Sequence, residues 1–92
     1  MLRLTNTSKF KKDYARESKV SENRDLDQIL NYVTYLLITE KVLPKRYKLH
    51  RLRGQYSGYL ECHLKPNLLL IYKIVGNEIV LTRLGSHSEV FR

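Results

Sequence analysis

A chain of 92 residues, 42% of them hydrophobic, suffices for one small domain and leaves no length for a second, so we expect residues 1–92 to fold as a single unit. Its 17 lysines and arginines outnumber nine aspartates and glutamates, and the formal charge of +8 indicates an anionic partner such as a nucleic acid, although such charge can also serve solubility alone. A single cysteine excludes an internal disulfide, and the longest apolar runs fall far short of the roughly 20 residues of a membrane-spanning helix. We therefore expect a soluble, cytoplasmic protein with no membrane partner.

The N-terminal segment predicts a short strand followed by a helix. Leu2 and Leu4 alternate with polar residues, as in a strand, and residues 6–8 offer side-chain oxygens that can cap a helix. Phe10 and Tyr14 give this helix a narrow apolar stripe, and lysines and arginines load its other faces. The helix therefore combines a contribution to the core with a basic surface.

A second, strongly amphipathic helix follows. It begins just after Asp25 and ends near Glu40, because Pro44 cannot donate a backbone hydrogen bond and disfavours helical geometry at the preceding residue. Its apolar side chains recur at intervals of three and four residues: Leu26, Ile29, Leu30, Val33, Leu36 and Leu37. Beyond this helix we expect a basic loop.

The remaining sequence predicts three strands. Residues 59–65 alternate between polar and apolar, residues 68–75 are almost continuously apolar, as in a strand covered on both sides, and residues 79–84 complete a hairpin. Turns are expected at 66–67 and 76–77. The predicted fold is α+β with the order β-α-α-β-β-β, in which two N-terminal helices pack on one face of a small, largely antiparallel four-stranded sheet.

Alternation along the first of these three strands assigns its two faces. If Leu60, Cys62 and Leu64 point to the helices, then Glu61 and His63 lie on the open face, where His63 is accessible. Cys62 is then a small core residue.

Histidine and arginine are the side chains best suited to chemistry in this chain. His50, His63 and His87 each lie in or beside a predicted loop or on the open face, and each can titrate near neutrality, although a single surface histidine is more often structural. Arg83 and His87 flank Gly85 at the end of the last strand, where they could converge on one phosphate or simply form a polar strand end. The histidine spacings match no zinc pattern, and we find no cofactor or nucleophile motif, so we expect no metal and no cofactor.

This inventory suits the transesterification of RNA, because RNA brings its own nucleophile. A general base takes the proton of a 2′-hydroxyl, the oxygen attacks the adjacent phosphorus, and a general acid protonates the departing 5′-oxygen while guanidinium groups stabilise the phosphate. Exposed tyrosines could stack on unpaired bases. A stretch without acidic residues would hold the RNA backbone through Lys45, Arg46, Lys48, Arg51 and Arg53.

The C-terminal half also carries a dense set of short motifs: Tyr47-Lys48-Leu49-His50, Arg51-Leu52-Arg53-Gly54, Gly58-Tyr59, Cys62-His63, residues 68–73, and Arg83-Leu84-Gly85-Ser86-His87 followed by Phe91. In these motifs, and in its length and order of elements, the chain resembles the YafQ branch of the RelE/ParE toxin superfamily. The resemblance implies a small sheet carrying two helices and endoribonuclease cleavage of mRNA in the ribosome. It also implies neutralisation by a DinJ-like antitoxin, in a complex such as a heterotetramer that binds its own operator DNA.

Residue by residue, the resemblance implies that His50 and His63 take part in proton transfer and that Arg83 stabilises the phosphate. His87 would serve catalysis or substrate positioning, and Phe91 would shape the site by packing or stacking.

The chain departs from the family pattern at Asn67 and Leu68, where the family has an acidic residue followed by tryptophan. Asn67 can hydrogen-bond to a substrate but cannot exchange a proton, and it is also simply a good turn residue. Two classes of function therefore stay open: an mRNA endonuclease toxin, or a non-catalytic module that acts as a ParE-like contact inhibitor or binds nucleic acid. Alanine at His63 and His87 separates them, because only the first class needs imidazoles.

Overall fold

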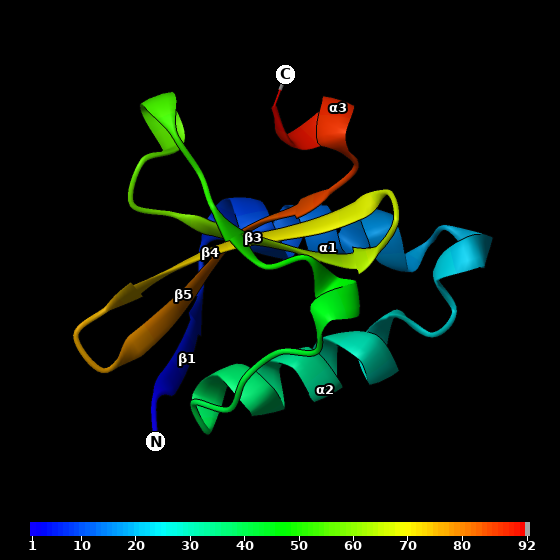
Figure 1. Cartoon of the computed structure of the whole chain (residues 1–92). Coiled ribbons are helices and arrows are strands. Elements are labelled where there is room, and N and C mark those ends of the chain that lie inside the picture. The colour runs from blue at the N-terminus through cyan, green and yellow to red at the C-terminus, as the bar shows by residue number, and fades with distance from the viewer. Residues whose placement is uncertain (92) are drawn as a thin grey trace.

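The computed structural model describes residues 1–91 and has a five-stranded mixed sheet at its centre (Figure 1). Across the sheet the strands follow the order β1 (Arg3–Asn6), β5 (Glu78–Gly85), β4 (Leu68–Val75), β3 (Leu60–Lys65) and β2 (His50–Arg51). The edge strand β1 runs parallel to β5, and the other neighbouring strands pair antiparallel. The α+β class predicted from the sequence is confirmed.

Helices lie against the sheet and beyond its end. They are α1 (Ser8–Ser18), α2 (Leu26–Ile38) and the single-turn α3 (His87–Val90), joined by the 3₁₀ segments η1 (Ser21–Asn23), η2 (Lys45–Tyr47) and η3 (Gly54–Tyr56). Figure 1 shows α2 on one side of the sheet, whereas the η3 segment and α3 rise on the opposite side. None of the described helices is long and apolar enough to cross a membrane.

The predicted architecture of four strands and two helices missed β2 and α3. β2 pairs over only two positions, His50 with Glu61 and Arg51 with Leu60, so it is too short to show alternation in the sequence. α3 is one turn long, and a capping box starts it: Glu89 N–H donates to the Ser86 hydroxyl, and the Glu89 carboxylate accepts from Ser86 N–H. This Ser-x-x-Glu signature of a helix start is present in the sequence.

The core lies between α2 and one face of the sheet, and side chains of β3 and β4 point into it. Cys62 and Leu64 of β3 point into this core, as alternation predicted, and they pack with an apolar stripe of α2: Leu26, Leu30, Val33, Leu36 and Leu37. α2 ends at Ile38, two residues before the predicted end, and Glu40 follows with a left-handed backbone (φ +59°). Burial raises the pKa of Cys62 to about 12, so this thiol stays protonated at neutral pH.

α1 contributes to the same core and also lies along the edge of β5. Thr7 caps the helix by accepting from Phe10 N–H (3.0 Å), and Phe10 is buried in the core. The Thr7 hydroxyl also donates to the Thr82 carbonyl of β5 (2.9 Å). β1 pairs with β5 only as far as Leu81. Beyond Leu81, α1 lies along β5 in place of β1.

Candidate active site

His50, Glu61 and His63 form a cluster on the open face of the sheet. The β2–β3 register sets His50 opposite Glu61, and His63 follows Glu61 by two residues and so shares its face. Glu61 Oε1 lies 3.1 Å from Nε2 of His50 and 3.4 Å from Nε2 of His63, and the two ring centroids are 6.1 Å apart. Strand pairing thus brings two imidazoles to one carboxylate oxygen.

Glu61 is buried although it lies on the open face. Its exposure is only 4%, whereas the side chains of His50 and His63 are 48% and 23% exposed. A carboxylate removed from water needs hydrogen-bond donors, and the two imidazoles are the groups that face it. The histidines therefore both cover the carboxylate and remain open to a substrate.

Both ring nitrogens of His50 face oxygen atoms of neighbouring residues. Nδ1 is 2.8 Å from the Lys48 carbonyl, which can only accept, and Nε2 faces the Glu61 carboxylate. Lys48 holds its carbonyl there in a left-handed conformation (φ +49°), which is uncommon for a non-glycine residue and often marks functional sites.

Arg83 and His87 lie on the same side of the sheet, two strands away from the histidine cluster. Glu61 pairs with Ile71 of β4, and Ile71 pairs with Arg83 of β5. Two strand spacings therefore separate the backbones of Glu61 and Arg83 by roughly 10 Å. His87 then begins α3, just beyond the end of β5.

A row of aromatic rings joins the η3 loop to the C-terminal segment, and one of its members, Tyr56, lines a cavity together with Arg83. The Tyr56 ring meets the Phe91 ring edge-to-face at 5.3 Å, and the His87 ring lies 4.8 Å from Phe91. On the other side Tyr56 contacts Tyr59 at 6.0 Å, and its hydroxyl donates to the Val90 carbonyl (3.3 Å). The η3 loop and the C-terminal segment therefore meet on the open face of the sheet.

The Arg83 guanidinium is paired with a buried carboxylate of α1, Asp13. Arg83 Nε donates to Asp13 Oδ2 at 2.8 Å, and the carboxylate also accepts from Arg16 Nη1 and from Leu84 N–H. Burial alone would raise the pKa of Asp13, but the hydrogen bonds from Arg83, Leu84 and Arg16 outweigh it and hold this pKa below its ordinary value.

This lowered pKa predicts a specific loss of stability in acid. A carboxylate with a lower pKa in the folded state stabilises the protein above its unfolded pKa of about 3.9, and this contribution is lost as the pH falls through the folded value. We expect the free energy of unfolding of the parent protein, measured with denaturant, to fall more steeply between pH 5 and pH 3 than that of Asp13→Asn. An equal dependence of the unfolding free energy on pH in the two proteins would contradict the lowered pKa of Asp13.

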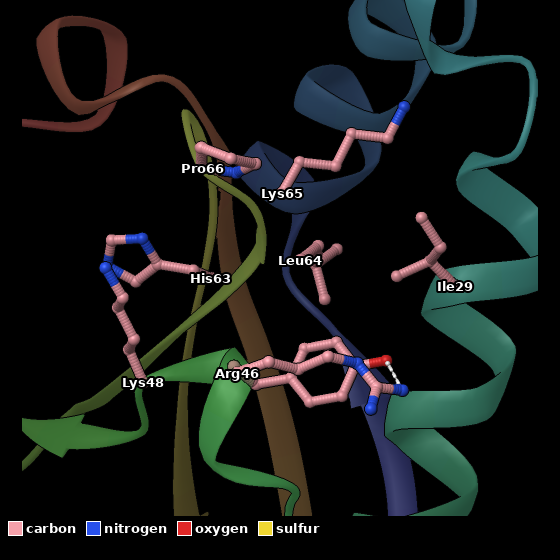
Figure 2. A pocket seen from close by; sticks show the side chains of 8 residues that line it. Ile29, Arg46, Lys48, His63, Leu64, Lys65 and Pro66 are labelled. Atoms are coloured by element: carbon pink, nitrogen blue, oxygen red, sulfur yellow. Dashed lines mark hydrogen bonds between the residues drawn. The ribbon is translucent and has the colours of Figure 1, made fainter.

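A cavity of about 440 Å³ opens beside His63, around the edge of β3 (Figure 2). Figure 2 shows Leu64 and Ile29 on the side of α2, and His63 and Lys48 on the opposite side of β3. Arg46 stacks on the Tyr47 ring at 4.7 Å and donates to its hydroxyl. The cavity thus combines apolar walls with a cationic rim next to a candidate catalytic group.

Comparison with known proteins identifies the family of this chain. Residues 2–92 match the family model described as the bacterial toxin of a type II toxin-antitoxin system, YafQ. The chain belongs to the YafQ family. One relative, the mRNA interferase toxin YafQ of Escherichia coli K12, is 35% identical over 80 residues, which cover 85% of this chain and 87% of the relative.

Solved structures of YafQ-like toxins share the whole fold of this family member. The toxin in the E. coli DinJ-YafQ toxin-antitoxin complex superposes with a TM-score of 0.84 at 31% identity and covers 100% of both chains. A metal-bound toxin from Helicobacter pylori gives a TM-score of 0.83 at 40% identity and covers 99% of this chain and 100% of that one.

Within this YafQ-family chain, His50, Glu61 and His63 could also hold a metal ion. One ligand atom from each residue lies within 4.8 Å of the other two, and two imidazoles with one carboxylate are donors that zinc and copper accept. The histidine spacings in the sequence match no zinc pattern, and strand pairing, which spacing does not report, brings these three ligand atoms together.

The other residues predicted to contact RNA surround the cluster unevenly. Lys45 and Arg46 lie on η2 and Lys48 follows it, and Arg46 and Lys48 line the cavity of Figure 2. Arg51 and Arg53 lie at and beyond the exposed end of β2. Asn67 lies in the exposed turn between β3 and β4, and it lines a different hollow, with Lys65 and Ser86.

Glu61 and Asp13 are the site residues that the sequence analysis did not select. Alternation already placed Glu61 on the open face with His63, and only its partner strand was unknown. Asp13 gave no such signal, because an acidic residue on a basic helix ordinarily faces solvent.

Proposed function

We propose that this chain is a toxin that cleaves mRNA on the ribosome, and that a DinJ-like antitoxin neutralises it. The observation that carries the proposal is the cluster of His50, Glu61 and His63, which shares the open face of the sheet with Arg83. The E. coli relative named an mRNA interferase supports the activity, and the DinJ-YafQ complex supports the partner.

The reaction is an acid/base transesterification within the RNA. The 2′-oxygen attacks the adjacent phosphorus as its proton passes to a base, and the bond from phosphorus to the 5′-oxygen breaks as an acid protonates that oxygen. The products are a 2′,3′-cyclic phosphate and a 5′-hydroxyl. His50 and His63 exchange these protons, and Glu61 stabilises their charged forms.

Arg83 stabilises the negative charge that develops on the phosphate, and His87 with Phe91 positions the nucleotide. Lys45, Arg46 and Lys48 hold the RNA backbone next to His63, where the cavity of Figure 2 can take an adjacent base. Further basic contacts come from Arg51 and Arg53, and Asn67 supplies a hydrogen bond rather than a proton.

Primer extension on mRNA from induced cells tests activity, cleavage position and one residue together. We expect shortened transcripts, with ends inside codons being translated, when the parent protein is expressed. We also expect at least about tenfold less cleavage with His87→Ala. Intact mRNA in growing cells that contain the soluble protein would contradict the proposal. Toxicity that survives alanine at both His63 and His87 would favour contact inhibition instead.

Occupation of the histidine cluster by a metal ion is expected to inhibit cleavage. An ion bound to Nε2 of His50 and His63 takes the electron pairs that would accept and return protons. Stoichiometric Zn²⁺ or Cu²⁺ should lower the cleavage rate about tenfold or more, and a chelator should restore it. Unchanged or increased activity with a bound ion would show that proton transfer does not pass through these two nitrogens.

The antitoxin has a physical reason to bind this surface. A formal charge of +8 favours an acidic, partly disordered segment that folds on the toxin. Co-purification with the neighbouring gene product is expected at low and moderate salt, and the complex would bind operator DNA. Failure to recover a partner in either condition would contradict this part of the proposal.

A further inference from the structure

Side chains of α1 replace a partner strand along the end of β5. The Asp13 carboxylate accepts from Leu84 N–H at 2.9 Å, and Arg16 Nη2 donates to the Leu84 carbonyl at 2.9 Å. Both polar groups of this strand residue are thus bound to one helix. The segment between Arg83 and His87 therefore depends on α1 for its position.

Asp13 holds Arg83 through one edge of the guanidinium. Arg83 Nε lies 2.8 Å from Oδ2 and Nη2 lies 3.4 Å from Oδ1, which is the fork-like geometry that fixes direction as well as distance. Asp13 is only 3% exposed, so water does not compete for this pair. The remaining amine of Arg83, Nη1, takes part in neither contact and is available for a phosphate oxygen.

A second contact ties the same helix to α3. Arg16 Nε lies 3.3 Å from Glu89 Oε2, and Glu89 Oε1 accepts from Ser86 N–H, which starts the helix that carries His87. Gly85 makes this approach possible, because a Cβ there would lie 2.7 Å from Arg16 Nη2. Arg83 and His87 are therefore both fixed relative to α1.

The cavity in front of this network suits an anion. Its volume is about 650 Å³, and its lining includes four cationic side chains against two carboxylates: Lys9, Lys12, Arg16 and Arg83 with Asp13 and Glu89. Tyr56 and Val90 complete the wall, so the cavity adjoins the aromatic row over the open face.

We propose that Asp13 is a positioning residue for RNA cleavage: it holds Arg83 by Nε and Nη2 so that Nη1 meets the scissile phosphate. The inference rests on the proposed function and adds to it a residue outside the histidine cluster. A lysine in place of Arg83 could not be held in this way, because its single nitrogen cannot serve the carboxylate and the phosphate with fixed geometry.

The test compares Asp13→Asn with Glu17→Gln by single-turnover cleavage of mRNA on ribosomes. Glu17 is the matched control, because it is a buried acid on the same helix and pairs with Arg16 (3.0 Å) without touching Arg83. We expect Asp13→Asn to lower kcat about 10- to 100-fold while KM changes less than about threefold. Glu17→Gln should keep kcat within about twofold of the parent, even if its unfolding temperature falls as much as that of Asp13→Asn.

A double-mutant cycle with Arg83→Ala separates positioning from general destabilisation. If Asp13 acts through Arg83, Asp13→Asn should change the kcat of Arg83→Ala by less than about twofold. An equal loss in both backgrounds, or an equal loss with Glu17→Gln, would overturn the inference. A normal kcat for Arg83→Ala alone would instead remove Arg83 from the proposed function, and the inference with it.

A measurement on the unmodified protein covers the case in which Asp13→Asn does not fold. Proton exchange at arginine Nε is followed by NMR, and exposed Arg51 and Arg53 give the reference rate. The Arg83 Nε proton should exchange at least about tenfold more slowly, because it is bonded to a buried carboxylate. Exchange as fast as the exposed arginines would overturn the inference without any variant.

Discussion

Replacing His63 with alanine is expected to lower kcat for cleavage of ribosome-bound mRNA by about 10²- to 10⁴-fold. The ring is half-buried, its Nε2 lies 3.4 Å from Glu61 Oε1, and it lines the cavity that could take an adjacent base. The substitution removes a proton-transfer group and leaves the Glu61 carboxylate with one imidazole. Ribosome binding should change little, because lysines and arginines supply most of the attraction to RNA.

Single-turnover cleavage on programmed ribosomes measures the chemical step, and a co-sedimentation assay measures binding. Thermal unfolding of the same preparation serves as the control. It must show that the His63→Ala variant is folded at the assay temperature, so that a lower kcat is not caused by unfolding. A variant that binds ribosomes normally and cleaves within about threefold of the parent would remove His63 from the reaction.

Sequence patterns predicted the strands best where one face is buried. The alternation from Leu60 to Leu64 placed Cys62 in the core and His63 on the opposite face, because a strand with a period of two can bury only one set of its side chains. The amphipathic pattern of α2 succeeded for the same reason. Buried positions recur with the period of the strand or helix, and the prediction uses this recurrence.

The histidine cluster could be predicted only in part, because the contact that creates it is not periodic. β2 has two residues, and its pairing with β3 joins His50 to Glu61 across a loop that contains η3. No local pattern reports such a pairing. The sequence therefore supplied both imidazoles and missed the carboxylate between them.

Arg83 illustrates a second limit. Its place at the end of the last strand was correct, but its guanidinium is bound to Asp13, a residue far away in the chain. Ion pairs of this kind depend on which helix face meets which strand edge, and charge along a single helix does not determine that. The proposed phosphate contact therefore depends on α1, which a reading of the C-terminal motifs alone would leave out.

Replacing Glu61 with glutamine is expected to lower kcat on the order of 10²-fold, with KM little changed. Glutamine keeps the size of the side chain, so the β2–β3 contact should survive. It removes the negative charge that faces Nε2 of His50 and Nε2 of His63. An amide can donate to an unprotonated imidazole but does not stabilise an imidazolium, so proton exchange between the two rings and the RNA loses its support.

Glu78→Gln provides the control for charge, because it also raises the formal charge of +8 by one while lying at the start of β5, next to the hairpin turn and away from the cluster. Cleavage by this variant should stay within about twofold of the parent. If both glutamine variants lost activity equally, net charge would account for the effect. If Glu61→Gln kept full activity, the two histidines would work without the carboxylate, and the 3.1 Å contact between His50 and Glu61 would have only a structural role.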